Sequence, residues 1–104
     1  MARILEIDYW KVIPGRGGDV DELAWKFSKF AYKNLDAVFK FGSVRVGRYI
    51  DHEAFSFLWE SSVGYENWML DCGLNKEFQD WLTIVEEGGQ EHKRVDCDII
   101  HLVS

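Results

Sequence analysis

Two carboxylates near the start of the chain are the groups best placed to move a proton. Glu6 and Asp8 lie two positions apart in an extended, apolar segment, so both point to the same face of a strand. Where such a face is enclosed, loss of water raises the pKa of a carboxyl, and a carboxyl with a raised pKa can serve as a general base. The alternative is a structural role, in which one or both carboxylates form ion pairs with Arg45 or Arg48.

A histidine near the end of the chain is the second candidate for proton transfer. His101 is the histidine expected inside a strand, whereas His52 falls in a turn and His92 in a loop. In the expected fold the first and last strands are neighbours, so His101 could lie opposite Asp8, which would hold its tautomer. The alternative is a partly buried histidine without a catalytic role. A metal would need Glu6, Asp8 and His101 to converge, and no metal site is predicted.

Several aromatic residues in the middle of the chain are candidates for binding a ligand. Trp59, Tyr65 and Trp68 can form a wall for a planar molecule, worth about 0.5–1.5 kcal/mol for each well-placed ring pair. Tyr49 can add a phenolic donor, and Arg45 can add a positive charge. The alternative is that these rings pack as an ordinary core between helices and sheet.

The composition indicates a small globular domain that avoids nucleic acid and membranes. The chain has 104 residues and is expected to form one domain over 1–104, with 47% hydrophobic residues, five Trp, four Tyr and seven Phe. Its net charge is −6 and its basic residues are scattered, so nucleic acid and anionic membranes are poor partners. No stretch approaches the roughly 18 apolar residues of a membrane helix. An acidic residue follows the start too early for a signal peptide, so a cytoplasmic location is expected.

The two cysteines carry little chemical signal. Cys72 and Cys97 are far apart and belong to no CxxC or His-spaced cluster, so a zinc site is not indicated. Nothing near Cys72 in the sequence would activate it as a nucleophile. Both are expected to be reduced thiols.

The periodic segments occur in the order strand, helix, strand, strand, helix, strand. The strands are predicted over about 3–13, 43–50, 54–60 and 95–103. One helix begins at Asp19; the other begins at Ser61 or Ser62, is interrupted near Gly73 and Asn75, and resumes until Gly88-Gly89. This order predicts an α+β, ferredoxin-like βαββαβ antiparallel sheet with two helices on one face.

The first and last predicted strands of the chain are apolar on both faces. The first and last strands carry apolar side chains at odd and even positions, whereas a sheet with one wet face should alternate cleanly. A second copy of the chain, packed face to face, would cover the excess apolar surface. A homodimer is therefore expected.

Short motifs at two places resemble the antibiotic biosynthesis monooxygenase superfamily. The run Trp59-Glu60-Ser61 followed by Tyr65 and Trp68 is similar to the family's W-x-S-x-x-x-aromatic-x-x-W/H signature. The segment from Val12 to Gly15, V-x-P-G, is similar to the end of the family's first strand. The resemblance implies a dimeric α/β barrel with a pocket between helices and sheet in each subunit. It also implies cofactor-independent oxidation of quinol-like aromatics or haem degradation, with isomerisation and cyclisation in relatives of the fold.

Matching residues to the family's pattern disfavours haem. Asp8 falls where haem-degrading members carry a pocket Asn, and Trp59 falls where they carry a pocket Trp. The second helix has Glu77, Phe78 and Gln79 at the turn where those members place the axial His. The resemblance therefore implies no haem ligand, and no cofactor is expected.

Two classes of function remain in view. The first is an enzyme that binds a small, largely apolar and aromatic molecule: a cofactor-independent monooxygenase, or an isomerase or cyclase, with Asp8 or His101 taking a proton. The second is a non-catalytic ligand-binding or interaction module. An enclosed cavity of roughly 300–1,000 Å³ beside Asp8 or His101 favours the first class. A cleft filled by Trp59, Trp68 and Phe57 favours the second.

Overall fold

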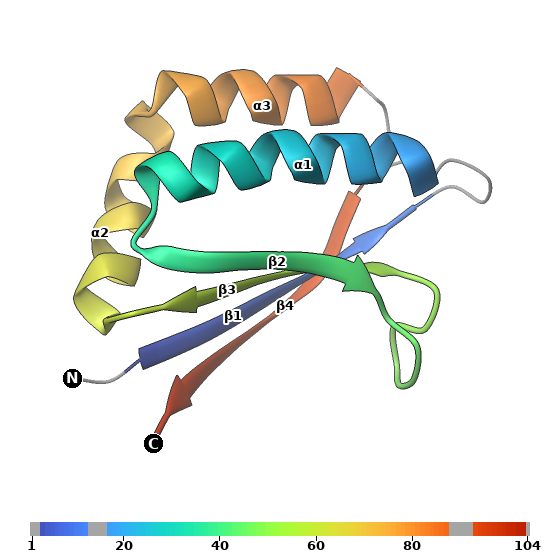
Figure 1. Ribbon diagram of the computed structural model, residues 1–104, viewed down its shortest axis with the longest axis horizontal. Helices are drawn as coiled ribbons and strands as arrows, with labels where there is room; N and C mark the ends of the chain where they lie inside the picture. The colour runs from blue at the N-terminus through green and yellow to red at the C-terminus, as the bar shows by residue number, and fades with distance from the viewer. Residues whose placement is uncertain (1–2, 13–16, 88–92, 104) are drawn as a thin grey trace.

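A four-stranded antiparallel sheet carries all the described helices on one face (Figure 1). The computed structural model describes residues 3–12, 17–87 and 93–103. Along the chain the elements are β1 (Arg3–Lys11), α1 (Gly17–Asn34), β2 (Ala37–Ser43), β3 (Glu53–Trp59), α2 (Ser62–Asp71), the 3₁₀ turn η1 (Cys72–Leu74), α3 (Lys76–Glu87) and β4 (Lys93–Leu102). The strands lie in the order β2-β3-β1-β4, which makes β1 and β3 central.

The fold class predicted from the sequence is confirmed. The two central strands, β1 and β3, are the ones that each lead into a helix. This sheet order is that of the ferredoxin-like fold. Over the described residues, no helix combines the length and the apolar character that crossing a bilayer requires.

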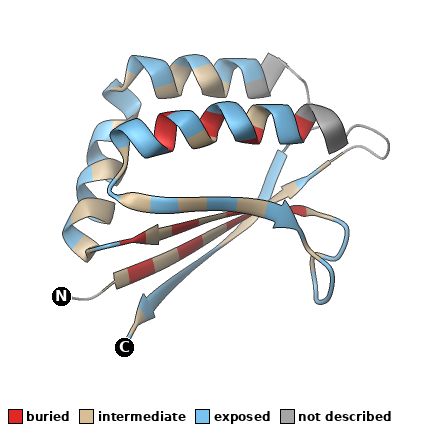
Figure 2. Ribbon diagram, in the orientation of Figure 1, coloured by how far each residue is buried: buried red, intermediate tan, exposed pale blue. Residues whose placement is uncertain are grey.

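The central strand β1 alternates as its sequence indicates. Ile4, Glu6 and Asp8 are buried beneath the helices, while Leu5 and Ile7 between them are half-buried on the other face (Figure 2). The same alternation appears on β3. Both carboxylates are therefore held on the covered face by the geometry of the strand itself.

The position of the second strand was predicted wrongly. The strand β2 spans Ala37–Ser43 rather than 43–50, and Phe39 and Phe41 turn their rings toward the helices. The segment 44–52 forms turns instead, with Gly47 at φ 114° and Asp51 at φ 69°. These left-handed residues cannot continue a ladder, although the valines, tyrosine and isoleucine around them favour strands.

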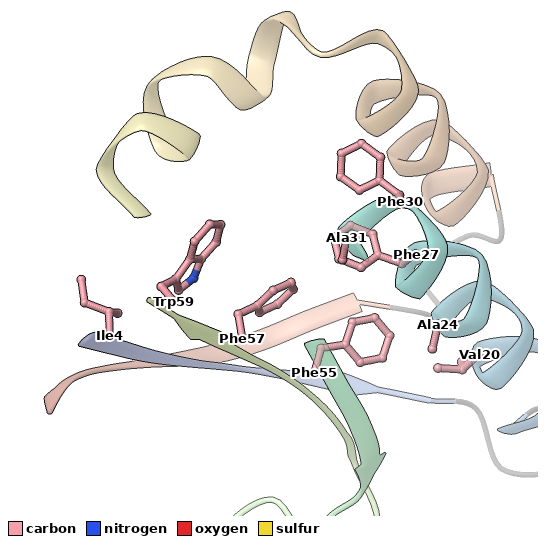
Figure 3. Packing of buried hydrophobic residues seen from close by; sticks show 9 residues of the cluster. All are labelled: Ile4, Val20, Ala24, Phe27, Phe30, Ala31, Phe55, Phe57 and Trp59. Atoms are coloured by element: carbon pink, nitrogen blue, oxygen red, sulfur yellow. The ribbon is translucent and has the colours of Figure 1, made fainter. Parts of the chain in front are cut away.

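The core is a dense cluster of aromatic rings between α1 and the sheet (Figure 3). Ala24 and Ala31 are fully buried, so α1 approaches the strands closely. The ring of Phe27 lies 5.6 Å from that of Phe57 and 4.7 Å from that of Trp81, linking the sheet to α3. The buried apolar residues are Ile4, Val20, Ala24, Phe27, Phe30, Ala31, Phe55, Phe57 and Trp59.

The predicted break in the second helical segment is confirmed. Ser61 caps α2, because its Oγ accepts from the Gly64 N–H at 3.1 Å. Gly73 lies in η1, and the Asn75 Oδ1 accepts from the Phe78 N–H at 2.9 Å where α3 begins. In Figure 1, α2 lies across one end of the sheet while α3 runs beside α1. The predicted stop at Gly88-Gly89 lies outside the described residues.

Replacing the ring at the centre of the core tests this packing. We expect Phe27→Ala to lower the free energy of unfolding by about 3–5 kcal/mol, because it leaves a cavity among rings that cannot collapse onto it. Denaturant unfolding measures the loss. Tyr32→Ala on the same helix is the control, since Tyr32 is 93% exposed. A loss at Phe27 no larger than that of the control would contradict the described core.

Candidate functional site

A cavity of about 370 Å³ lies between the covered face of the sheet and the helices. Its volume falls within the range of small-molecule pockets, roughly 300–1,000 Å³. Aromatic rings make up most of the wall, and polar groups gather at β1 and β4. The lining residues are Glu6, Asp8, Trp10, Phe27, Phe55, Phe57, Trp59, Trp68, Met69, Cys72, Phe78, Trp81, Leu82 and Arg94.

The two carboxyls of β1 are next to each other on the wall of this cavity. Glu6 is 7% exposed and Asp8 is 8% exposed. A carboxylate oxygen of each and the Sγ of Cys97 all lie within 4.8 Å of one another. Cys97 belongs to β4, where it is the direct partner of Asp8 in the ladder. The strand alternation therefore brings two acids and a thiol together without any help from a loop.

Each carboxyl has a different partner. The indole Nε1–H of Trp59 donates to Glu6 Oε1 at 3.4 Å, and this donor is neutral. A guanidinium nitrogen of Arg94 lies 3.5 Å from Asp8 Oδ1, and this partner is charged. The positive charge is therefore in contact with Asp8, while the indole that donates to Glu6 is neutral.

Burial raises the pKa of Glu6 to about 8. Burial is the largest cause, and the value of about 8 also includes the hydrogen bond with Asp8 and the charge of Asp8, which raise the pKa of Glu6, and Trp59 and Arg94, which lower it. With a pKa of about 8, Glu6 keeps its proton at neutral pH. That proton stays on Glu6, because the carboxylate in contact with the guanidinium is that of Asp8.

The thiol beside the pair is inert. Burial, followed by the hydrogen bond with Asp8 and its charge, raises the pKa of Cys97 to about 12. A neutral thiol is a poor nucleophile. The carboxylate oxygens of Glu6 and Asp8 and the Sγ of Cys97 could act as ligands of one cation. Arg94, however, already supplies positive charge to this cluster. The arrangement is therefore suited to proton transfer.

Three of the predicted ligand-binding aromatics belong to this region. Trp59 and Trp68 line the cavity of about 370 Å³, which their rings do not fill. Tyr65 packs behind Trp59, with ring centroids 5.9 Å apart and nearly perpendicular planes. The Trp68 ring is steadied by Phe78 at 5.0 Å. These contacts fix flat apolar surfaces around open space.

The expected position of His101 opposite Asp8 is wrong. In the β1–β4 ladder His101 pairs with Ile4, whereas Asp8 pairs with Cys97. Four positions along a strand separate His101 from Cys97 by about 13 Å. His101 is exposed and does not line the cavity. The histidine was placed correctly on a strand, but the register could not be obtained from the sequence.

Tyr49 and Arg45 also lie away from the cavity. Both belong to the turn segment 44–52, and Arg45 is exposed there. The Tyr49 ring stacks on Tyr9 at 4.6 Å, and its hydroxyl donates to Asp96 Oδ2. Tyr9 lies on the face of the sheet opposite to Glu6 and Asp8. Both residues were expected near the ligand because 43–50 was predicted to be a strand, whereas 44–52 forms turns.

Arg94 is the functional residue that sequence reasoning missed. Arg45 and Arg48 were the expected ion-pair partners of the carboxylates, and Arg94 takes that place instead. The last strand was expected to begin at Val95, which left Arg94 in a loop, whereas β4 begins at Lys93. The adjacent basic pair just before the predicted strand was the available signal.

The described cavity lining does not suit a haem held by histidine. No imidazole is present among the described lining residues. The α3 turn at which the family places its ligand carries Glu77, Phe78 and Gln79. The ring of Phe78 occupies the wall there, 5.0 Å from Trp68.

Known proteins share the fold of this chain. No family model matches the sequence, and no curated protein matches it. A Bacteroides thetaiotaomicron protein of unknown function, suggested to be an oxidoreductase, is similar over 97% of this chain and 98% of its own, with a TM-score of 0.70 and 11% identity. A Bordetella bronchiseptica protein provisionally named an antibiotic biosynthesis monooxygenase gives a TM-score of 0.69 and 18% identity, covering 100% of this chain and 98% of its own.

A third similar structure is a haem degrader, MhuD of Mycobacterium tuberculosis, with two haems bound in its active site. Its TM-score is 0.64 at 11% identity, covering 97% of this chain and 96% of its own. At such identities the likeness shows the fold alone. The chain has the fold of the antibiotic biosynthesis monooxygenase-like proteins, as its short motifs imply.

The raised pKa of Glu6 predicts how stability depends on pH. The folded state keeps a proton that the unfolded chain has lost, so stability falls as pH rises from about 5 to about 8. We expect Glu6→Gln to remove this part of the slope, at most about 3 kcal/mol between pH 5.5 and 8. Denaturant unfolding at the two pH values measures it, with the exposed Glu66→Gln as control. An unchanged slope in Glu6→Gln would mean that Glu6 titrates normally.

Proposed function

We propose that this protein binds a small, planar, largely apolar molecule in its cavity and takes a proton from it with Asp8. The observation that carries the proposal is the pair of buried carboxyls, holding one proton between them, on the wall of an aromatic cavity. A carboxylate at such a position can accept a proton from a hydroxyl or from an acidic C–H group. Trp59 and Trp68 supply flat surfaces for a ring.

The proposed reaction is a monooxygenation that needs no cofactor. Removing a proton makes an electron-rich ring anion, which can react directly with dioxygen. In the keto tautomer of a hydroxylated ring, the ring carbon that bears two hydrogens becomes a carbonyl: one oxygen atom of O₂ enters the product, and the other leaves as water with the two hydrogens. Glu6 holds a proton that it can give to the departing oxygen. The fold shared with proteins named as monooxygenases supports this choice.

Oxygen uptake tests the proposed reaction. Purified protein is mixed in air with a panel of planar aromatics that carry a hydroxyl, and consumption of O₂ and formation of product are followed together. We expect Asp8→Asn to reduce turnover by about 10²–10⁴-fold, because the base is lost. Asp80→Asn, on the exposed side of α3, should leave turnover unchanged.

The other outcomes distinguish the remaining classes. Exchange of a ligand hydrogen with deuterium from solvent, without O₂ uptake, would point to an isomerase or cyclase that uses the same carboxyls. Binding with neither exchange nor uptake would identify a ligand-binding module and contradict the proposed reaction.

A second copy of the chain covers the open face of the sheet in this proposal. The described helices all lie on the other face (Figure 1). Across the open face Val38 pairs with Leu58, Leu58 with Leu5, and Leu5 with Ile100, which makes one apolar row over all four strands. A row of this kind can pack against its own copy about a two-fold axis. A ligand-binding homodimer of two α/β layers results.

A charge placed in the apolar row tests the dimer. We expect the unmodified protein to sediment as a dimer and Ile100→Glu to sediment as a monomer, because the carboxylate cannot be buried between two sheets. Ile100 is already 42% exposed in one subunit, so its fold should survive the change. Tyr32→Glu on the helical layer is the matched control. A stable, folded monomer of the unmodified protein in dilute solution would overturn this part of the proposal.

A further inference from the structure

The ladder between β1 and β4 contains one irregularity, and it lies beside the cavity. Tyr9 pairs with Asp96, and the next residue, Trp10, pairs with Arg94. Val95 is therefore passed over and has no partner on β1. An extra residue of this kind on one strand is a β-bulge.

The bulge decides which face of the sheet Arg94 occupies. In a regular ladder Trp10 would pair with Val95, and Arg94 would point to the open face. With Val95 passed over, Arg94 becomes the partner of Trp10 and shares its face with Asp8. Bulges of this kind often re-aim a side chain next to an active site. The shift brings a guanidinium nitrogen to 3.5 Å from Asp8 Oδ1.

Arg94 differs from the other residues around the cavity in charge and in exposure. Among the described residues, no lysine or arginine other than Arg94 lines the cavity. Its side chain is 57% exposed, whereas that of Asp8 is 11% exposed. Asp8 Oδ1 forms no hydrogen bond of ordinary geometry within the described residues, so this ion pair is its main polar contact. The guanidinium therefore reaches the buried pair from the water side.

We propose that the bulge at Val95 makes Arg94 a positioning residue, which keeps the negative charge of the carboxyl pair on Asp8 and the proton on Glu6. This inference rests on the proposed function, because it explains how the two carboxyls acquire different roles. Two carboxyls this close cannot both ionise readily, and the charge settles on the one nearer a cation. Without Arg94 the proton is shared between them, and Asp8 is no longer a free base.

The other titratable groups around the pair do not provide this asymmetry. The β3 residues that face the pair are Phe55, Phe57 and Trp59, and the α3 residues that line the cavity are apolar or aromatic. The titratable neighbours are Cys97 and Arg94 from β4, Tyr65 from α2 and Cys72 from η1. Of these, Arg94 alone carries charge at neutral pH: burial raises the pKa of Tyr65 above its ordinary value, and Cys97 is a neutral thiol.

Carboxyl titration of the ligand-free protein tests the assignment directly. Protein labelled with carbon-13 in its Asp and Glu carboxyls is followed by NMR from pH 4 to 10, in the unmodified form and as Arg94→Gln. Arg94 lowers the pKa of Glu6, so its loss should move the midpoint of Glu6 upward from about 8, by about one pH unit. The carboxyl signal of Asp8 should then move in the same step, since both groups share the proton.

Three further variants show whether charge and placement are the cause. Arg94→Lys should restore the midpoint of Glu6, and Lys93→Gln, an exposed neighbour, should leave it unchanged. Deleting Val95 should reproduce Arg94→Gln, because the regular ladder turns Arg94 to the open face. If the deletion variant does not fold, the Gln and Lys variants decide the outcome. A midpoint of Glu6 that is the same in Arg94→Gln and in the unmodified protein would overturn the proposal.

This experiment separates the inference from the proposed reaction. The titration needs no substrate, so absence of turnover would contradict the proposed function and leave the role of Arg94 standing. If turnover is found, Arg94→Gln should shift the acidic limb of the kcat/KM profile to higher pH, because Asp8 then binds a proton more readily. An unshifted limb would overturn the positioning role and leave the reaction intact.

Discussion

Burying two carboxyls side by side is the condition on which the rest of this structure depends. Two ionised carboxylates at this distance, away from water, would be strongly destabilising. In this protein Glu6 keeps its proton and the guanidinium of Arg94 contacts Asp8. The indole N–H of Trp59 also donates a hydrogen bond to Glu6. Such an arrangement has a stability cost that an apolar core would not have, and it lies on the wall of the cavity between the sheet and the helices.

The aromatic cluster and the carboxyl pair depend on each other. The rings of Phe27 and Trp81 pack together at 4.7 Å, and both line the cavity. They hold α1 and α3 above the sheet, which keeps water away from β1. Because the wall is largely apolar, the electrostatic interactions of the acids are stronger than they would be at a surface. The core therefore gives the site both its shape and its chemistry.

Local patterns were sufficient for much of this structure. The two-residue period of β1 correctly placed Glu6 and Asp8 on one covered face, and a serine cap and a glycine correctly located the start and the break of the second helical segment. Trp59 and Trp68, predicted to bind a ligand, both line the cavity, and their role in binding stays a prediction. Each of these features is determined by residues close together in the sequence.

The features that failed depend on distant pairing. The valines, tyrosine and isoleucine of segment 44–50 favour a strand, but the strand forms at 37–43, where the rings of Phe39 and Phe41 pack against α1. The distance between His101 and Asp8 depends on the register of two strands at opposite ends of the chain. The bulge at Val95, which turns Arg94 toward the cavity, shifts the pairing of β1 with β4 by one residue from Trp10 onward. The sequence of β4 does not reveal this shift, because the strand carries apolar residues at both odd and even positions.

The helix α2 forms a partly exposed side of the cavity. None of its residues is fully buried, yet Trp68 and Met69 form part of the cavity wall. The helix α1, in contrast, holds Ala24 and Ala31 against the sheet with no exposure. The cavity is therefore enclosed on one side by a helix with fully buried residues and on another by side chains that remain partly exposed to solvent.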